Sequence, residues 1–274
     1  MESKNFIIEA NRLEGQYWKD LWRYRELLYF LAWRDLLVRY KQTVIGIVWA
    51  LLRPFLTMLV FTVVFGNLAK LPSEGAPYPI LVFAGLLPWQ FFANALSESS
   101  SSLIDNSNLI SKVYFPRLLV PASSIIVSLV DFAVSGLILA GLMLWYGFAP
   151  SLAILTLPFF ILLAFAAAFG AGLWLAALNV KYRDFRYVVP FVVQLGLYIS
   201  PVGFSSGIVP EGWRLLYSLN PMVGVIDGFR WAILGGTASI YWPGFLLSTV
   251  LVGMLCFSGV WYFRRTEQSF ADVI

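Results

Sequence analysis

Residues 152–178 read LAILTLPFFILLAFAAAFGAGLWLAAL, a run of 27 residues without a charged side chain. An α-helix rises 1.5 Å per residue, so about 20 apolar residues cross a hydrocarbon core of about 30 Å. The run is long enough to form a membrane-spanning helix. It therefore identifies lipid as the solvent in which the chain folds.

The composition of the whole chain agrees with this solvent. Of its 274 residues, 59% are hydrophobic and 12% are charged, and the mean hydropathy is +0.77. Soluble domains carry about 25% charged residues, so a water-soluble globule is excluded. The chain contains no His and one Cys, Cys256, which excludes His-based acid–base catalysis, Cys/His metal sites and an intrachain disulfide.

Five further segments have the apolar character of a span. The sequence predicts an all-α integral membrane protein with six transmembrane helices, at about 44–66, 80–102, 118–147, 152–178, 187–204 and 243–263. Residues 1–40 are expected to form a cytoplasmic N-terminal segment, and residues 41–274 the membrane domain.

The positive charges predict how the chain lies in the membrane. Sixteen of the 19 Lys and Arg residues precede or open the first span or lie in loops on the same side, which leaves Lys70, Arg214 and Arg230 for the other side. Because positively charged loops stay in the cytoplasm, both termini are expected to be cytoplasmic. The net charge of +4 favours contact with membrane lipids over nucleic acid, because no Arg/Lys-rich aromatic groove pattern accompanies it.

Residues 215–236 are apolar enough to suggest a seventh span, but we do not expect them to cross the membrane. A crossing would place Arg264 and Arg265 on the outer side, and an Asn-Pro pair interrupts the stretch. A helix of about 20 Å is too short to cross. We therefore expect a re-entrant hairpin at about 209–236, between spans five and six, beside a pathway through the protein.

Charged residues also fall at depths where hydrocarbon makes a charge costly. Asp131 lies near the middle of the third span, where an ionised side chain costs at least about 2.5 kcal/mol. It is interpreted either as a polar wall or pairing site for Arg53, or as a helix-packing group bonded to Ser135. In the hairpin, Asp227 and Arg230 stand at i, i+3 spacing and are expected to pair with each other or to cap the hairpin.

Two amphipathic segments are expected on the cytoplasmic side. Residues 16–40 mix Trp, Tyr and Leu with charged residues, as in a helix that lies in the headgroup plane, either as an anchor or to transmit a push from a partner. Residues 105–117, DNSNLISKVYFPR, predict a short helix capped by Asp105 or Ser107 and ended by Pro116. Its apolar face has no protein of its own chain to bury it, so it is either a docking element or a helix on lipid.

Four stretches of the sequence together resemble one family. They are WRYRELLYFLAWRDLLVRYKQTVIGIVWALLRP at 22–54, KVYFPR at 112–117, NVKYRDFR at 179–186 and SPVGFSSGIVPEGWRLLYSLNPMVGVIDGFRWAILGG at 200–236. In this order they resemble the membrane subunit of bacterial ABC exporters for polysaccharides, and among these the O-antigen and capsule exporter permeases. The combination is specific, although no single stretch is.

The resemblance implies a non-catalytic, channel-forming subunit that acts as a homodimer with two copies of a separate ATPase. The implied cargo is a polyprenyl-diphosphate-linked polysaccharide, foremost an O-antigen, carried across the bacterial inner membrane. ATP and Mg are expected on the partner subunit, with no cofactor and no metal on this chain. In agreement, the sequence lacks the GxxxxGKS or GxxxxGKT phosphate loop.

The resemblance also assigns roles to residues of this sequence. A coupling helix to the ATPase is expected around 108–115, with Asn108, Leu109, Ile110, Lys112, Val113 and Tyr114. An interface helix is expected around 17–29, with Trp18, Trp22 and Arg25. The hairpin is expected to act as a periplasmic gate, with Trp213, Asn220, Asp227 and Arg230 as candidates.

A glycan channel is expected to carry aromatic side chains, because the CH faces of sugars stack on aromatic rings. The candidates for its lining are Trp49, Arg53, Phe61, Trp89, Phe92 and Asp131. Trp89 and Phe92 share one helix face, and so do Phe61 and Phe65. The alternative is that these rings are packed in the protein or face lipid.

Other classes remain open at this point. A membrane-embedded transferase acting on lipid-linked sugars would need acid–base residues gathered at one face, but Glu98, Asp105 and Asp184 form no paired-carboxylate cluster. A proton-coupled carrier is compatible with Asp131, but no clear internal repeat is found. Within the exporter class, capsular polysaccharide and teichoic acid are alternatives to O-antigen.

Overall fold

The computed structural model describes residues 14–41, 44–235 and 240–270, and the side chains of 14–16, 41–47, 49 and 50 lie outside the described set. All regular structure in the described residues is helical, as expected. The α-helices are α1 (Glu14–Arg23), α2 (Arg25–Lys41), α3 (Val44–Phe61), α4 (Tyr78–Asp105), α5 (Ser107–Lys112), α6 (Leu119–Trp145), α7 (Leu157–Lys181), α8 (Phe185–Ile199), α9 (Glu211–Tyr217), α10 (Pro221–Leu234) and α11 (Trp242–Thr266). Short helical turns of other pitch are η1 (Thr62–Leu68), η2 (Leu152–Thr156), η3 (Ser206–Ile208) and η4 (Glu267–Ser269).

Five helical segments of the described chain are long and apolar enough to cross a membrane. They are Leu51–Leu68, Tyr78–Asp105, Leu119–Trp145, Leu152–Lys181 and Trp242–Ser269. These segments coincide with five of the six expected spans. The first runs from α3 into the π-helical turn η1.

The fifth expected span, 187–204, contains the shorter helix α8, whose 15 residues measure about 22 Å along the axis. The expectation that the helix continues to residue 204 is wrong. Ser200 precedes Pro201, and the residue before a proline is driven toward extended backbone; Ser200 has a ψ angle of 152°.

Helix α4 forms the centre of the bundle. Every residue from Ile80 to Trp89 is buried. This helix packs against α3, α6, α7, α8 and α10. Because every side of this stretch is buried, it is surrounded by protein where an ordinary span would face lipid on one side.

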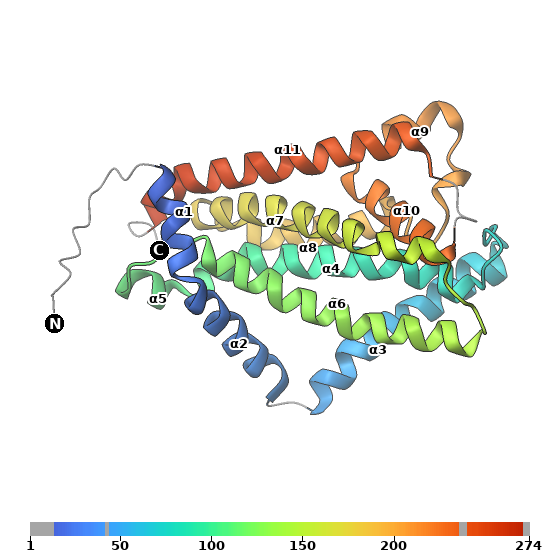
Figure 1. Ribbon diagram of the computed structural model, residues 1–274, viewed down its shortest axis with the longest axis horizontal. Coiled ribbons are helices and arrows are strands. Elements are labelled where there is room, and N and C mark those ends of the chain that lie inside the picture. The colour runs from blue at the N-terminus through green and yellow to red at the C-terminus, as the bar shows by residue number, and fades with distance from the viewer. Residues whose placement is uncertain (1–13, 42–43, 236–239, 271–274) are drawn as a thin grey trace.

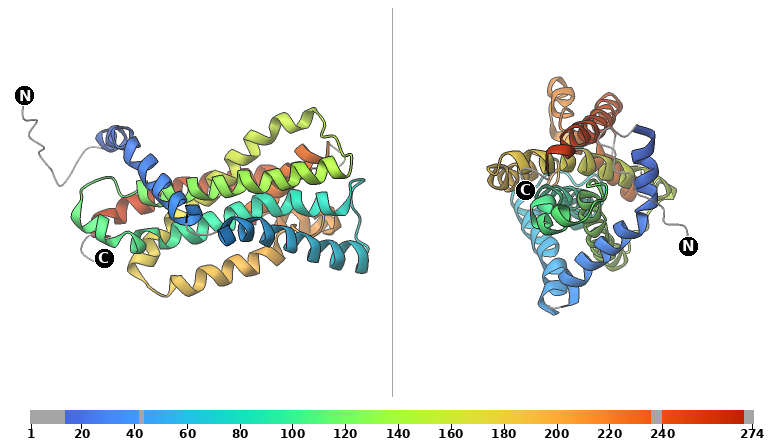
Figure 2. Two further views of the ribbon diagram at one scale, coloured as in Figure 1. Left: turned by 90° about the horizontal axis from the view of Figure 1, so that it is seen from below. Right: turned by 90° about the vertical axis from the view of Figure 1, so that its left-hand side faces the viewer.

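The bundle has two distinct ends (Figure 1). Helices α1 and α5 and the end of α11 lie at one end, which we call the α5 end, and α9 and α10 lie toward the other, which we call the α9 end. Helices α2 and α3 form a V in Figure 1, and both of its arms contact α6; Figure 2 shows α8 at the margin of the bundle. The packed centre of the bundle is therefore α4 with α6, α7, α10 and α11.

Small residues allow two of these helices to touch through their backbones. A Cβ atom added to Gly259 of α11 would lie 2.3 Å from the carbonyl oxygen of Gly170 in α7, and one added to Gly170 would lie 2.6 Å from the backbone of Cys256. In lipid, close packing of this kind replaces the hydrophobic driving force that acts in water. Helices α7 and α11 thus form a tightly packed pair.

Replacement of Gly259 by Ala is expected to destabilise the purified protein by about 1–3 kcal/mol, because the added methyl group must push α7 and α11 apart. The measurement is the thermal unfolding midpoint in detergent. Gly253 of the same helix is the matched control, since no atom lies within 4 Å of an added Cβ there. Equal midpoints for G259A and G253A would contradict the proposed backbone contact.

Candidate functional site

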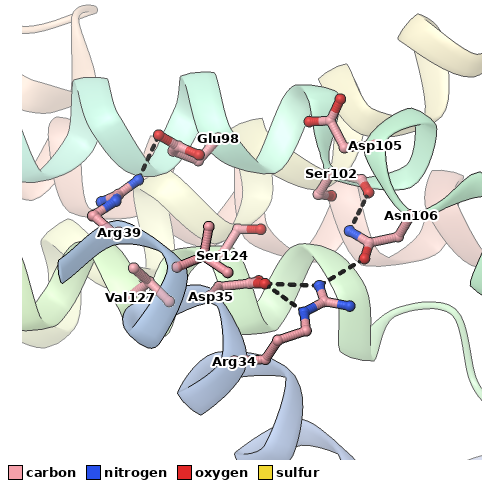
Figure 3. Close-up of a pocket in the computed structure, with 10 residues that line it drawn as sticks. Arg34, Asp35, Arg39, Glu98, Ser102, Asp105, Asn106, Ser124 and Val127 are labelled. Carbon is pink, nitrogen blue, oxygen red and sulfur yellow. Dashed lines mark hydrogen bonds and ion pairs between the residues drawn. The ribbon is translucent and has the colours of Figure 1, made fainter. Parts of the chain in front are cut away.

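A cavity of about 490 Å³ opens at the α5 end between α2, α4 and α6. Figure 3 shows that its wall is made largely of charged and polar side chains. Arg34 donates from Nε and Nη2 to one oxygen of Asp35, at 2.9 and 2.7 Å, and Nη2 also donates to Asn106 at 2.7 Å. Asn106 in turn donates to the carbonyl oxygen of Ser102 at 2.9 Å. These bonds tie the middle of α2 to the end of α4.

A second group of polar side chains ties the last turn of α2 to the bundle. Arg39 pairs with Glu98 of α4 at 2.6 Å and with Asp131 of α6. The hydroxyl of Tyr40 donates to the other oxygen of Asp131. The Asp131 side chain is 15% exposed, so its charge is largely removed from solvent. Paired charges are tolerated in such surroundings, whereas a single one is strongly destabilising.

The partner of Asp131 differs from both expectations. Its carboxylate binds Arg39 and Tyr40, and neither Arg53 nor Ser135 is its partner among the described side chains. Arg53 is exposed on α3, which is itself one arm of the V. The reason is tertiary: α2 returns toward α6 and brings its last turn against the middle of that helix.

The loop helix α5 is shorter than predicted. It covers Ser107–Lys112, and Val113 already has extended backbone, so the expected helix to residue 115 is wrong. Asn106 occupies the N-cap position in place of Asp105 or Ser107, without a side-chain capping bond. The helix thus ends three residues before Pro116, as the φ of −128° and ψ of 133° at Val113 show.

The apolar face of α5 is divided between the protein and its surface. Ile110 is 5% exposed and packs in a cluster with Leu31, Leu103 and Phe115, and Leu109 packs beside it. The expectation that the chain offers nothing to bury this face is therefore wrong. Val113 and Tyr114 are 52% and 58% exposed, and Asn108 and Lys112 are exposed as well. The loop thus has an anchored side and a displayed side.

The expected interface helix consists of two helices, α1 and α2, which meet at Tyr24. Trp18 and Trp22 of α1 are exposed, and the guanidinium of Arg25 lies 5.2 Å from the centre of the Trp22 ring. Leu31 and Ala32 of α2 are buried, whereas Tyr29, Phe30 and Trp33 of the same helix are exposed. Helix α1 is amphipathic, but α2 exposes apolar side chains, so the role of the segment as an interface helix stays a prediction.

At the α9 end, Arg230 of α10 is 1% exposed and its guanidinium binds backbone carbonyls. Nε donates to Leu81 at 3.2 Å, Nη1 to Phe204 at 2.6 Å and Nη2 to Val202 at 2.8 Å. Gly85 leaves the space for it, since an added Cβ would lie 2.7 Å from Nη2. The expected ion pair with Asp227 is replaced by this carbonyl cradle, which joins α10 to α4.

The other residues that the sequence suggests for the gate lie apart from Arg230. Asp227 accepts a hydrogen bond from Ser206. The Asn220 side chain caps α10 by accepting from the backbone N–H of Met222 at 3.0 Å, and it donates to Ser200 at 2.9 Å. Trp213 is 64% exposed on α9. The candidates therefore lie on one hairpin but do not converge on one point.

The aromatic candidates divide in the same way. The rings of Trp89 and Phe92 lie 5.7 Å apart and those of Phe61 and Phe65 5.5 Å apart, as their shared faces predict. Trp89 and Phe61 are 5% and 9% exposed, so both are packed within the chain, and a channel wall made of them would require the surrounding helices to part. Trp49 falls on α3, but its side chain lies outside the described residues.

Sequence reasoning missed Arg39, Tyr40 and Glu98 as members of a polar cluster. Arg39 is one of many positive charges before the first span, and its partner Asp131 is 92 positions away. The Arg39-Tyr40 pair directly before an apolar span could have indicated this cluster. A cation at such a position must either reach the lipid headgroups or pair with an acidic side chain.

Replacement of Asp131 by Ala is expected to lower the stability of the purified protein by about 3–5 kcal/mol, because Arg39 loses a buried partner. R39M combined with D131A is expected to recover part of that loss, since neither charge then remains. The measurement is a double-mutant cycle of unfolding free energies in detergent. Additive effects of the two substitutions would contradict the pairing.

Comparison with known proteins identifies the family of this chain. Two relatives named O-antigen export system permease protein RfbA are 26% identical over 91% of this chain and 95% of the Klebsiella pneumoniae protein, and 31% identical over 77% of this chain and 82% of the Myxococcus xanthus protein. The polysialic acid transport protein KpsM of Escherichia coli is 23% identical over 81% of this chain and 88% of its own length. Residues 26–234 match the family described as ABC-2 type transporter. Since this match covers more than half of a chain rich in membrane-spanning helices, the protein is a membrane permease that belongs to the ABC-2 type transporter family.

Proposed function

We propose that this chain is the channel-forming subunit of an ATP-driven exporter that carries a polyprenyl-diphosphate-linked O-antigen across the bacterial inner membrane. The observation that carries the proposal is the alignment, over 77–91% of the chain, with relatives named as O-antigen export permeases. In the proposal the chain acts as a homodimer with two copies of a separate ATPase. That partner holds ATP and Mg, and this chain is a non-catalytic subunit.

The α5 end is the cytoplasmic end in this proposal. It carries Lys112, Arg117, Arg264 and Arg265, and positively charged segments stay inside. Both chain termini then lie in the cytoplasm. The residues that α5 and its loop display, above all Val113 and Tyr114, contact the ATPase, while Leu109 and Ile110 anchor the loop to the bundle. Residues 1–40 form the cytoplasmic segment, and residues 41–274 the membrane domain.

The α9 end is periplasmic in the same proposal, and α9 with α10 forms the re-entrant gate. Helix α10 has 14 residues, about 21 Å, and α9 has seven, so neither crosses a core of about 30 Å. The fifth of the six spans in this proposal is formed by α8 together with the residues that follow it to 204. The cradle around Arg230 then fixes the gate to the central helix α4.

The passage for the glycan runs between the two copies, beside α3. The exposed Arg53 supports this position for the passage. A charge in an apolar helix is unstable against lipid, and it is stabilised where water or a diphosphate group contacts it. Phe92, which is partly exposed, and Trp49 remain candidates for stacking on sugars. Asp131 holds the V of α2 and α3 to the bundle, in place of the expected polar wall.

A capsular polysaccharide is the second candidate cargo. It is favoured by the similarity to the polysialic acid transport protein of Escherichia coli, at 23% identity against 26–31% for the O-antigen permeases. Both cargoes are long glycans, so the same passage serves either.

The proposed function is tested by reconstitution in lipid vesicles. Lipid-linked O-antigen is expected to cross the membrane only when this chain, its ATPase and ATP are all present. Movement driven by a proton gradient without ATP would instead identify a carrier, and chemical change of the glycan by the chain alone would identify an enzyme. Either result would overturn the proposal.

The ATPase contact is tested by crosslinking. The V113C variant, labelled with a short photoreactive group, is expected to form an adduct with the ATPase in the active complex. The matched control is L152C, at an exposed position of η2 near the α9 end. An adduct from both variants, or from neither, would contradict the assigned orientation.

A further inference from the structure

Glu267 occupies a junction of three chain segments at the α5 end. It lies in η4, directly after α11. The hydroxyl of Tyr17 in α1 donates to Oε2 of Glu267 at 2.9 Å, and the backbone N–H of Arg117 donates to Oε1 at 2.7 Å. The Arg117 guanidinium donates to the Glu267 carbonyl oxygen. One residue thus joins the interface helices, the end of the α5 loop and the last span.

Neighbouring contacts hold this junction in place. The guanidinium of Arg264 lies 4.0 Å from the centre of the Tyr17 ring. Burial raises the pKa of the Tyr17 phenol, and the Glu267 carboxylate adds to this effect, so the hydroxyl keeps its proton and remains a donor. Below the polar contacts, the rings of Phe263 and Phe270 meet at 5.3 Å inside the cluster that also contains Ile110.

Helix α11 connects this junction to the opposite end of the protein. Its 25 residues measure about 37 Å. Near the α9 end, Ser248 of α11 donates to the carbonyl oxygen of Ser218 at 2.9 Å, and a Cβ added to Gly224 of α10 would lie 2.6 Å from the Ser248 side chain. Around Cys256 and Gly259, α11 is packed backbone to backbone against α7. It is therefore a stiff link between the Glu267 junction and the α9–α10 hairpin.

We propose that Glu267 is the positioning residue that passes movement of the α5 loop and the interface helices on to α11, and through α11 to the α9–α10 hairpin. The inference rests on the proposed function, in which the ATPase moves the α5 loop. A carboxylate suits this place because its two oxygens accept from two separate segments at once. An apolar side chain would pack against both segments but would bind neither of them in a defined direction.

The chemistry of the junction suggests a graded set of variants. E267A removes both side-chain links, whereas E267Q keeps an acceptor for Arg117 and offers an N–H to the Tyr17 oxygen. Y17F removes one link and leaves the ring beneath Arg264, so it is the variant that retains the fold. D184A is the matched control, because Asp184 is an exposed acid directly before α8 and makes no side-chain cap bond.

The test measures ATP hydrolysis and glycan export by the same reconstituted complex. In E267A, ATP hydrolysis is expected to stay within about twofold of the unsubstituted complex while export per ATP falls about tenfold, a typical size for coupling between sites. Y17F is expected to show a smaller loss of the same kind, and E267Q and D184A to retain coupling. An unchanged export per ATP in both E267A and Y17F, or a parallel loss of hydrolysis and export, would overturn the inference.

Hydrogen exchange of residues 221–234 gives a readout that does not depend on the cargo. Addition of nucleotide to the complex is expected to change exchange in this segment, and E267A is expected to abolish that change. The same nucleotide response in E267A would reject the role of Glu267 even if the cargo were misassigned. A complex that responds to nucleotide but exports no glycan would overturn the proposed function alone.

Discussion

Hydrocarbon offers no hydrogen-bonding partner, and this constraint acts on the backbone and on the charged side chains of the chain alike. The backbone meets it by forming helices throughout the described residues. The guanidinium of Arg230 satisfies it by donating hydrogen bonds to three backbone carbonyls of two other segments. At the opposite end, Arg39 meets it with two acids from α4 and α6. Each charge is stable only because the tertiary structure brings acceptors to it.

Apolar contact alone does not explain how the helices choose their neighbours, because lipid tails are as apolar as leucine. Close backbone approach supplies the missing selectivity where α7 and α11 meet at Gly170 and Gly259. Helix α4, buried on all sides from Ile80 to Trp89, lies at the centre of the remaining helices. Helices α2, α3 and α8 lie at the margin of this body. In the proposed exporter these marginal helices are the ones free to meet a second copy.

The two ends of the bundle are built for different tasks in this proposal. At the α5 end, one short loop is anchored by Ile110 and displays Val113 and Tyr114, so a force applied from outside reaches the bundle through packed side chains. At the α9 end, a short hairpin is held to α4 by the cradle of Arg230 and to α11 by Ser248. Helix α11 runs between the two ends.

Hydrophobic length and charge are local properties, so the sequence alone determined the all-helical membrane class, five of the spans and the interruption of the apolar segment at Asn220. The partners of Asp131 and Arg230, the division of α5 into anchored and displayed sides, and the burial of Trp89 were decided only by the tertiary structure. These features depend on which helices become neighbours. Arg39 and Asp131 are 92 residues apart, and no local pattern states that α2 folds back onto α6.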